Sequence, residues 1–330
     1  MAGKKVRSWL GISDEAITEV AGITLKPYLS DPDVMFDACG KADAYFHREY
    51  GLRVPPRIPL HGWWSLALLD VHIEYPEDGW PHPMTRLARA RDVERLVMPT
   101  GDFFAHPGLT PLVAYDKAVC AVTGAKTHIH DGITLGPVTF ARTMRGDDFF
   151  IDLYESPDCA HKLLDFGTEF HLAFQRERRR YGGNPKEELM HIADDFAGMI
   201  SPKMWPEFVL PYWRRIFEER GVRAGSRTIM LHSELMNPEQ QMLAVRDLPI
   251  NCIECGEDPN VTIEDMNATG LEYWWHVKAL EMLNGGPDDV RRSFREAAEG
   301  GAPVVVSGVT HRHVPSENIR AFLEVSKEYA

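Results

Sequence analysis

Pairs of metal-ligating side chains recur in this sequence at a spacing of two residues. In a β-strand, residues two apart point to the same face, so each pair would present two donor atoms together. Imidazole nitrogen, thiolate sulfur and carboxylate oxygen are the ligands that zinc takes in proteins. The sequence therefore contains the donor set of a zinc site. The pairs are His128 with His130, His232 with Glu234, Cys252 with Glu254, and His311 with His313.

His232 and Glu234 form the most informative of these pairs. The run 227–231 precedes them and Asn237-Pro238 follows, which predicts that they lie where a strand ends. Two interpretations stay open here. The two side chains bind a metal ion, or they simply hydrogen-bond each other.

Two adjacent carboxylates, Asp194 and Asp195, end the apolar run 188–193. Close carboxylates can share a proton, which raises one pKa to a value suited to acid catalysis. Alternatively, one carboxylate caps the following turn while the other lines a pocket. We predict that Asp195 and Asp194 are the catalytic residues, with Asp195 as the first choice.

Three further side chains are candidates for binding a substrate. His128 and His130 could polarise a substrate oxygen, although histidines bonded to backbone carbonyls are commoner. Trp274 belongs to the aromatic run 273–275, whose members either fill the core or contact a flat ring. Cys252 and Cys255 have a CxxC spacing, but they would face opposite sides of a strand, and a buried, structural Cys252 is favoured.

The elements that must position these residues follow an alternating pattern. Strand and helix in alternation predict a parallel sheet covered by helices, and right-handed crossovers make a closed barrel one of few solutions. An open, doubly wound sheet usually carries a Gly-rich phosphate loop, and no GxGxxG or P-loop pattern occurs. The apolar runs are 126–133, 188–193, 228–231, 250–254 and 303–307, and the helical stretches are 158–181, 238–246, 288–298 and 316–329.

We therefore predict an α/β fold, a single (β/α)8 TIM-type barrel with an N-terminal helical extension. The barrel spans residues 1–330, of which about 1–125 form the helical extension and the first barrel units. Residues 126–330 supply the remaining βα units. The first long helix starts at Ser30-Asp31-Pro32, and Pro206 and Pro211 disturb the helix that follows Ser201.

Composition excludes several classes of protein. The chain has 330 residues, of which 44% are hydrophobic and 26% charged, as in an ordinary globular protein. A net charge of -13 argues against binding to nucleic acid or to an anionic membrane. No apolar run is long enough for a signal peptide or a membrane span, and five scattered cysteines indicate a reduced protein. We expect a cytoplasmic protein.

Three segments resemble the uroporphyrinogen decarboxylase superfamily. They are Asp194-Asp-Phe-Ala-Gly198 with the following Ser201–Tyr212, Gly136-Pro-Val-Thr-Phe-Ala-Arg-Thr-Met-Arg-Gly146, and the C-terminal Val314–Phe322. Their order is consistent over nearly the whole chain. The superfamily also contains zinc methyltransferases that serve corrinoid proteins.

The resemblance implies a zinc site. In those methyltransferases a His-x-Cys pair binds the metal, and a later cysteine completes the site. Here His232 matches, Glu234 replaces the first cysteine, and residues 307–313 contain none. Related O-demethylases use carboxylate-containing sites, which makes His232, Glu234 and Cys255 the predicted ligands, with His276, His311 and His313 in reserve.

The function that the resemblance implies is methyl transfer between a small methylated substrate, favoured as an aromatic methyl ether, and a corrinoid protein. Zinc would act as a Lewis acid on the substrate heteroatom. No Asp-x-His-x-x-Gly segment is present, so cobalamin is expected on a separate partner. One alternative is a uroporphyrinogen decarboxylase-type carboxy-lyase, but the Arg-Gln-Ala-Gly-Arg motif of those enzymes is absent. The other is a non-catalytic barrel that serves as a binding module.

Overall fold

A computed structural model of the chain describes residues 5–59, 63–129, 134–183, 188–254, 257–309 and 312–330. Helices and parallel strands alternate along it, as expected of an α/β protein. The chain divides into two compact units, one formed by residues 1–59, 76–80 and 253–330 and the other by residues 60–75 and 81–252. None of the described helices combines the length and the apolar character needed to traverse a lipid bilayer.

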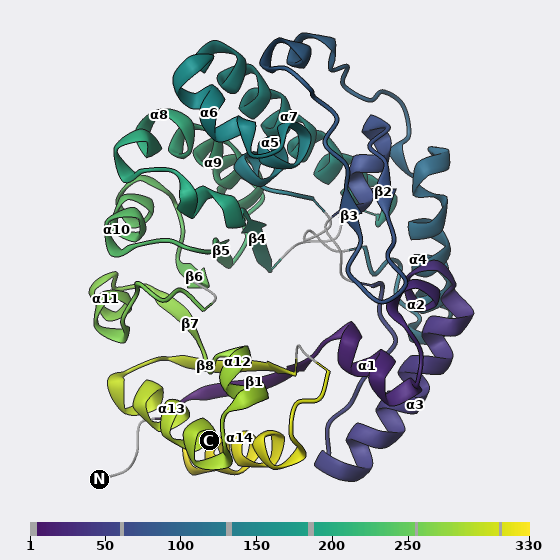
Figure 1. The fold of residues 1–330 in the computed structure, drawn as a ribbon, viewed down its shortest axis with the longest axis vertical. Coiled ribbons are helices and arrows are strands. Elements are labelled where there is room, and N and C mark those ends of the chain that lie inside the picture. The colour runs from purple at the N-terminus through teal and green to yellow at the C-terminus, as the bar shows by residue number, and fades with distance from the viewer. Residues whose placement is uncertain (1–4, 60–62, 130–133, 184–187, 255–256, 310–311) are drawn as a thin grey trace. The chain divides into compact units, whose positions relative to one another are not determined.

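The first unit is built on parallel strands with helices beside them. Strand β1 (Arg7–Ile12) pairs with β8 (Val304–Val309), which pairs with β7 (Glu272–His276). Helices α13 (Pro287–Gly300) and α14 (Ser316–Glu328) pack on each other next to β8 and β1 (Figure 1). Its other helices are α1 (Asp14–Ala21), α2 (Leu25–Ser30), α3 (Pro32–Tyr50), α11 (Ile263–Ala268) and α12 (Ala279–Asn284).

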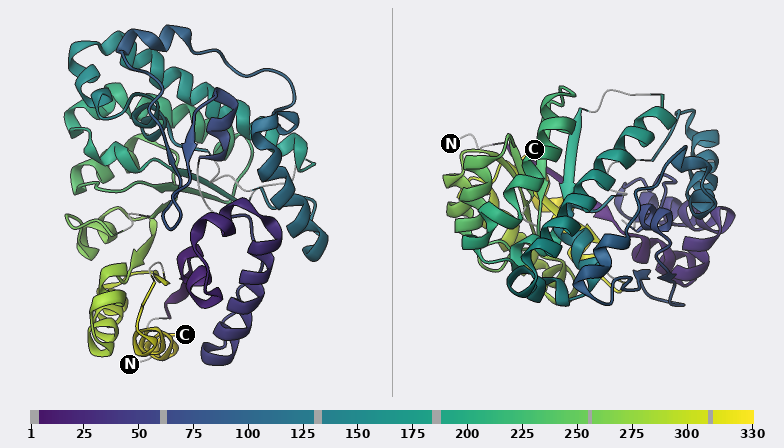
Figure 2. Two further views of the ribbon diagram at one scale, coloured as in Figure 1. Left: turned by 45° about the vertical axis from the view of Figure 1, so that its right-hand side comes forward. Right: turned by 90° about the horizontal axis from the view of Figure 1, so that it is seen from above.

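Helix α3 follows the sequence pattern closely. Asp31 accepts a hydrogen bond from the Asp33 backbone N–H, Pro32 occupies the first turn, and Gly51 ends the helix in a left-handed conformation. Helix α3 packs against α1 (Figure 2), and it carries an apolar stripe at helical spacing whose members are each at most 2% exposed. The stripe consists of Met35, Cys39, Ala42 and Phe46.

The second unit contains β4 (Leu189–Ala193) and β5 (Thr228–His232), which pair in parallel, and a short antiparallel pair, β2 (Ile73–Glu74) and β3 (His82–Pro83). Helices α5 (Pro137–Arg145), α6 (Asp148–Glu155) and α7 (Pro157–Tyr181) pack together (Figure 1). The remaining helices are α4 (Thr110–Thr123), α8 (Trp205–Phe208), α9 (Leu210–Ile216) and α10 (Pro238–Asp247). Short 3₁₀ segments lie at Trp64–Leu69, Ala90–Arg95, Phe103–Ala105, Pro107–Leu109, Asp195–Met199 and Pro202–Met204, and a π-helix at Phe217–Val222.

Two expectations about individual elements were confirmed and two were incomplete. The prolines split the segment after Ser201 into α8 and α9, and the predicted strands at 188–193 and 228–231 appear as β4 and β5. Strand β1 was not among the predicted apolar runs, and most of its residues alternate between exposed and half-buried. The apolar run 126–133 forms no strand over 126–129, and residues 130–133 lie outside the described part of the chain.

The expected eight-stranded barrel is only partly visible. Strand β6 (Cys252–Glu254) lies where the two units divide, and it neighbours β7. The described residues thus provide the parallel order β1-β8-β7-β6 and the parallel pair β5-β4. These strands and their flanking helices establish an α/β fold with parallel sheets.

Candidate active site

The ends of β4 and β5 bring the predicted residues of the second unit together. Ala193 is in register with His232, so the residues that follow β4 lie beside the end of β5. The Asp194 backbone N–H donates to the His232 carbonyl at 3.0 Å and continues the ladder by one residue. Parallel strands that end at one edge therefore place Asp194, Asp195, His232 and Glu234 close together.

Two carboxylates face one nitrogen of His232. Its Nε2 lies 3.2 Å from Asp195 Oδ1 and 3.9 Å from Glu234 Oε1. The His232 side chain is 19% exposed, whereas those of Asp195 and Glu234 are 45% and 44% exposed. Solvent therefore reaches the two carboxylates more readily than the imidazole. Negative charge on two sides of one nitrogen favours a positive charge there, whether a proton or a metal ion.

The backbone around Glu234 approaches the segment after Asp195 closely. A Cβ at Gly198 would overlap the Glu234 carbonyl oxygen and the Leu235 backbone, so only glycine allows this approach. Leu235 itself has a positive φ of 60°, a conformation that costs about 1–2 kcal/mol for a residue with a side chain. The turn after β5 therefore holds Glu234 beside His232 at the expense of backbone strain.

Asp194 is oriented away from this cluster and is completely buried. Its Oδ2 accepts from the Val138 N–H at 3.1 Å and the Trp213 Nε1–H at 2.6 Å, and its Oδ1 accepts from the Thr139 N–H at 2.6 Å. Burial raises the pKa of Asp194 to about 6, although these donors favour the ionised form and oppose the rise. The carboxylate thus satisfies the first turn of α5 and ties it to α9.

The fit between Asp194 and α5 requires glycine at position 136. The Gly136 N–H donates to the Ala193 carbonyl at 2.9 Å, which brings the start of α5 against the end of β4. A Cβ on Gly136 would overlap the Asp194 side chain. This contact explains why the Gly136-Pro137 turn and the Asp194-Asp195 pair belong to one structural unit.

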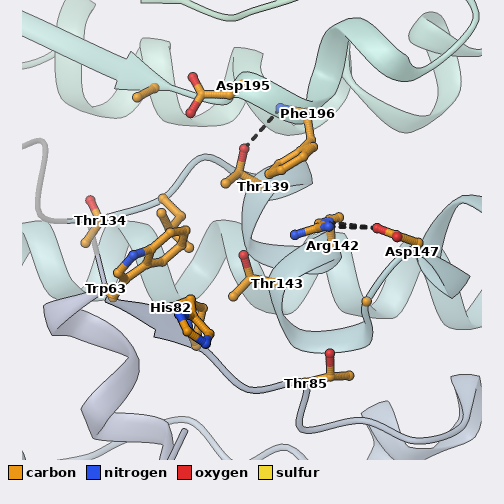
Figure 3. Close-up of a pocket in the computed structure, with 14 residues that line it drawn as sticks. Trp63, His82, Thr85, Thr134, Thr139, Arg142, Thr143, Asp147, Asp195 and Phe196 are labelled. Atoms are coloured by element: carbon orange, nitrogen blue, oxygen red, sulfur yellow. Dashed lines mark hydrogen bonds and ion pairs between the residues drawn. The ribbon is translucent and has the colours of Figure 1, made fainter. Parts of the chain in front are cut away.

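A cavity of about 650 Å³ lies beside Asp195 (Figure 3). Asp195 both lines this cavity and contacts His232, so it connects the cavity to the cluster of charges. Much of the lining is polar. The lining residues are Trp63, His82, Pro83, Thr85, Thr134, Leu135, Thr139, Arg142, Thr143, Gly146, Asp147, Ala193, Asp195 and Phe196.

Helix α5 supplies one wall of the cavity. Thr139, Arg142 and Thr143 are three and four residues apart, which places them on one helical face. The Thr139 hydroxyl accepts from the Phe196 N–H at 3.3 Å and so joins this wall to the segment that carries Asp195 (Figure 3). A volume of this size with hydroxyl, guanidinium and carboxylate groups suits a small polar molecule.

The fit of zinc to these residues is partial. His232 and Glu234, two of the three predicted ligands, are neighbours, and their donor atoms are of types that zinc accepts. Cys255, the third, lies outside the described residues. Within the described part of the chain, no group of three or more His, Cys, Asp or Glu side chains is arranged to hold a metal ion.

The other predicted residues occupy separate environments. The His128 ring bonds to the Thr123 hydroxyl at 2.6 Å and does not line the cavity, while His130 and His311 lie outside the described residues. His276 Nε2 lies 3.0 Å from Glu254 Oε1, a second imidazole–carboxylate pair at the ends of β7 and β6. Trp274 makes an edge-to-face contact with Trp9, and Cys252 is buried as favoured, 1% exposed.

His313, the last reserve ligand, is 83% exposed and its Nδ1 lies 2.8 Å from Glu19. Its φ of 67° is left-handed, and its backbone N–H donates to the same carboxylate. The pairing explains how the strained turn before α14 is held.

Sequence reasoning missed most of the cavity wall. Thr139, Arg142 and Thr143 stand within the segment quoted for its family resemblance, but no role was inferred for them. Their helical spacing and polar character were a usable signal. Trp63 comes from a turn and His82 from the short strand β3, and nothing in their local sequence predicts that they line the same cavity as α5.

Comparison with known families agrees with this arrangement. The model of the uroporphyrinogen decarboxylase (URO-D) family matches residues 65–329. The chain belongs to the URO-D family. This membership confirms the resemblance noted in the sequence.

Similar proteins include two from Methanosarcina mazei. A methylcobamide:CoM methyltransferase, MtbA, is 23% identical over 203 residues, which cover 60% of this chain and 58% of the relative. A methylated-thiol–coenzyme M methyltransferase is 26% identical over 178 residues, which cover 52% and 45%. The aligned regions thus span about half the length of these relatives.

A solved structure shows the same fold. A methyltransferase from Methanosarcina mazei superimposes with a TM-score of 0.72 at 17% identity, and the match covers 100% of this chain and 95% of that one. Identity this low establishes the fold alone. The α/β architecture of this URO-D family member is therefore shared with that protein.

Proposed function

We propose that this URO-D family protein is a methyltransferase that moves a methyl group between a small substrate and a corrinoid carried by a separate protein. The single observation that carries the proposal is the cluster of Asp195, His232 and Glu234 beside a polar cavity of about 650 Å³. The names of the two Methanosarcina mazei relatives support the same reaction class. The complete (β/α)8 barrel predicted from the sequence is part of this proposal, and membership of the URO-D family supports it.

Methyl transfer needs a positive charge close to the substrate heteroatom. The two carboxylates around His232 Nε2 provide a position for that charge, and Asp195 faces the cavity where the heteroatom would sit. In the demethylating direction, the oxygen leaves with the electron pair of its bond to the methyl group and must receive a proton. The leaving oxygen would take this proton from solvent and become a hydroxyl, which would then donate a hydrogen bond to the Asp195 carboxylate.

We also propose that zinc binds here, with His232 and Glu234 as two ligands and Cys255 as the third predicted from the sequence. When bound, zinc would act as a Lewis acid toward the substrate heteroatom. A carboxylate in place of a thiolate makes the site harder, which supports an oxygen substrate such as an aromatic methyl ether. The methylated thiol in the name of one Methanosarcina mazei relative is the competing substrate class.

The test follows cobalt absorbance in both directions. In one, a methyl aryl ether, Co(I) cobalamin and a proton give the phenol and methyl-Co(III) cobalamin. In the other, methylcobalamin and a thiolate give the thioether and Co(I) cobalamin. Free cobalamin should react slowly with either substrate, and the cognate corrinoid protein should accelerate the reaction strongly.

Controls distinguish the alternatives. Asp195→Asn should lose turnover, whereas Arg246→Gln, a substitution of an exposed residue on α10, should leave it unchanged. Methyl transfer to a thiol without methyl transfer from an ether would support the methyltransferase function and contradict the O-demethylase function. Carbon dioxide release from a porphyrinogen in the absence of any corrinoid would refute the proposal and establish a carboxy-lyase.

A further inference from the structure

Arg142 is the only arginine or lysine among the residues that line the described cavity. It projects from the α5 wall between Thr139 and Thr143, and its side chain is 36% exposed. Figure 3 shows its guanidinium between the cavity and Asp147. The negative charge of Asp195 lies on a different side of the same cavity. The guanidinium of Arg142 and the carboxylate of Asp195 therefore line different parts of the cavity.

Two contacts orient the guanidinium. Its Nε and Nη2 lie 3.0 and 2.8 Å from Asp147 Oδ1, and its plane lies against the Phe196 ring at 4.5 Å from the ring centre. In the described part of the chain, Asp147 is its only hydrogen-bond partner. Since a guanidinium carries five N–H donors, donors remain for a further acceptor. Figure 3 shows one Arg142 nitrogen directed toward the space beside Thr143.

Asp147 does not cancel the charge of Arg142 in the cavity. Asp147 also lines the cavity, but its side chain is 82% exposed, so water screens its attraction to Arg142. The Phe196 ring covers one planar face of the Arg142 guanidinium. The N–H groups along the edge of the guanidinium are not covered by this ring. A planar edge of N–H donors matches the geometry of carboxylate and sulfonate oxygens.

We propose that Arg142 binds an anionic group, a carboxylate or sulfonate, on the small methyl donor or acceptor. The anionic end would lie at Arg142, with the threonine hydroxyls as additional donors, and the reacting heteroatom would lie at Asp195. Repulsion by Asp195 would disfavour the reverse orientation. The inference rests on the proposed function, because it assigns the substrate class of the same site.

Direct binding tests this inference independently of turnover. Calorimetry would compare two matched pairs of probes, 4-methoxybenzoate with methoxybenzene and 3-mercaptopropionate with 2-mercaptoethanol. The anionic member of at least one pair should bind the wild type about tenfold or more tightly than its neutral partner. Arg142→Gln should weaken binding of the anionic probe by about ten- to a hundredfold, which is the effect of losing a charge-assisted hydrogen bond. Binding of the neutral probes should change less than about threefold.

Matched variants separate recognition from structure. Arg142→Lys keeps the charge but loses the planar edge, so it should give an intermediate affinity, and it serves as the test if Arg142→Gln does not fold. Arg246→Gln removes an arginine that bonds to its neighbour Asp247 outside the cavity, and it should leave binding unchanged.

Two results would overturn the inference. One is equal affinity of the wild type for the anionic and neutral members of both pairs. The other is an equal loss of affinity for the anionic and the neutral probes in the Arg142→Gln variant. Anion-selective binding that depends on Arg142, without methyl transfer in either direction, would instead refute the proposed function and retain an anion-binding cavity.

Discussion

Asp194 offers a direct test of how burial and hydrogen bonding compete in this fold. Its carboxylate is completely buried, and three donors from Val138, Thr139 and Trp213 point at it. Burial raises its pKa to about 6, above the ordinary value of 3.8. Asp194→Asn removes the titration while keeping the shape of the side chain. The comparison of the two proteins across pH therefore isolates this one group.

The expected size and sign follow from the two pKa values. They differ by about two, and each pKa unit corresponds to about 1.4 kcal/mol, so the full effect is about 3 kcal/mol. Because the folded protein binds the proton more tightly than the unfolded chain, this stability is present below pH 3.8 and is lost as pH rises through about 6. Wild-type stability relative to Asp194→Asn should therefore fall by about 2 kcal/mol between pH 4 and pH 7, and the rest of the effect lies below pH 4.

Urea unfolding followed by tryptophan fluorescence, extrapolated to zero urea at each pH, measures this difference. The cost of replacing a carboxylate oxygen by an amide group does not depend on pH and cancels. Trp213→Phe removes a donor that favours the ionised form, so the pKa of Asp194 should rise further and the fall should extend to higher pH. A wild-type advantage that grows with pH would refute the reasoning and show that the donors outweigh burial.

Other substitutions test the site and its scaffold. Gly136→Ala should cost about 2–4 kcal/mol by forcing α5 away from Asp194, whereas Gly40→Ala, in an exposed helical turn with open space, should stabilise by about 0.5–1 kcal/mol. Asp195→Asn should lower turnover about a hundredfold and change the free energy of unfolding by less than about 1 kcal/mol, because this side chain is half-exposed; normal turnover would remove Asp195 from the chemistry. His232→Ala should abolish near-stoichiometric zinc binding measured by elemental analysis, and unchanged zinc would place the metal elsewhere.

The ends of β4 and β5 lie where the sequence pattern predicted them. Strand β4 ends at Ala193, directly before Asp194-Asp195, and β5 ends at His232, two residues before Glu234. Sequence pattern sufficed here because strand ends are marked locally, by apolar runs that stop at charged residues. The partner of His232 was only half predicted. The Asp195 carboxylate lies closer to His232 Nε2 than the Glu234 carboxylate does. This difference depends on the register of β4 and β5, which the sequence pattern does not give.

The sequence by itself determined the alternation of helices and strands, the caps of α3 and the interruption between α8 and α9, since each depends on neighbours along the chain. Tertiary structure alone decided which of two adjacent carboxylates is buried. Asp194 turns toward the amides of α5 and Asp195 toward the cavity, and neither contact is encoded nearby. Arg142 entered the site in the same way. Its position on α5 follows from the local sequence. It lines the cavity because segments far apart in the chain pack against α5, and local propensity does not determine which segments pack together.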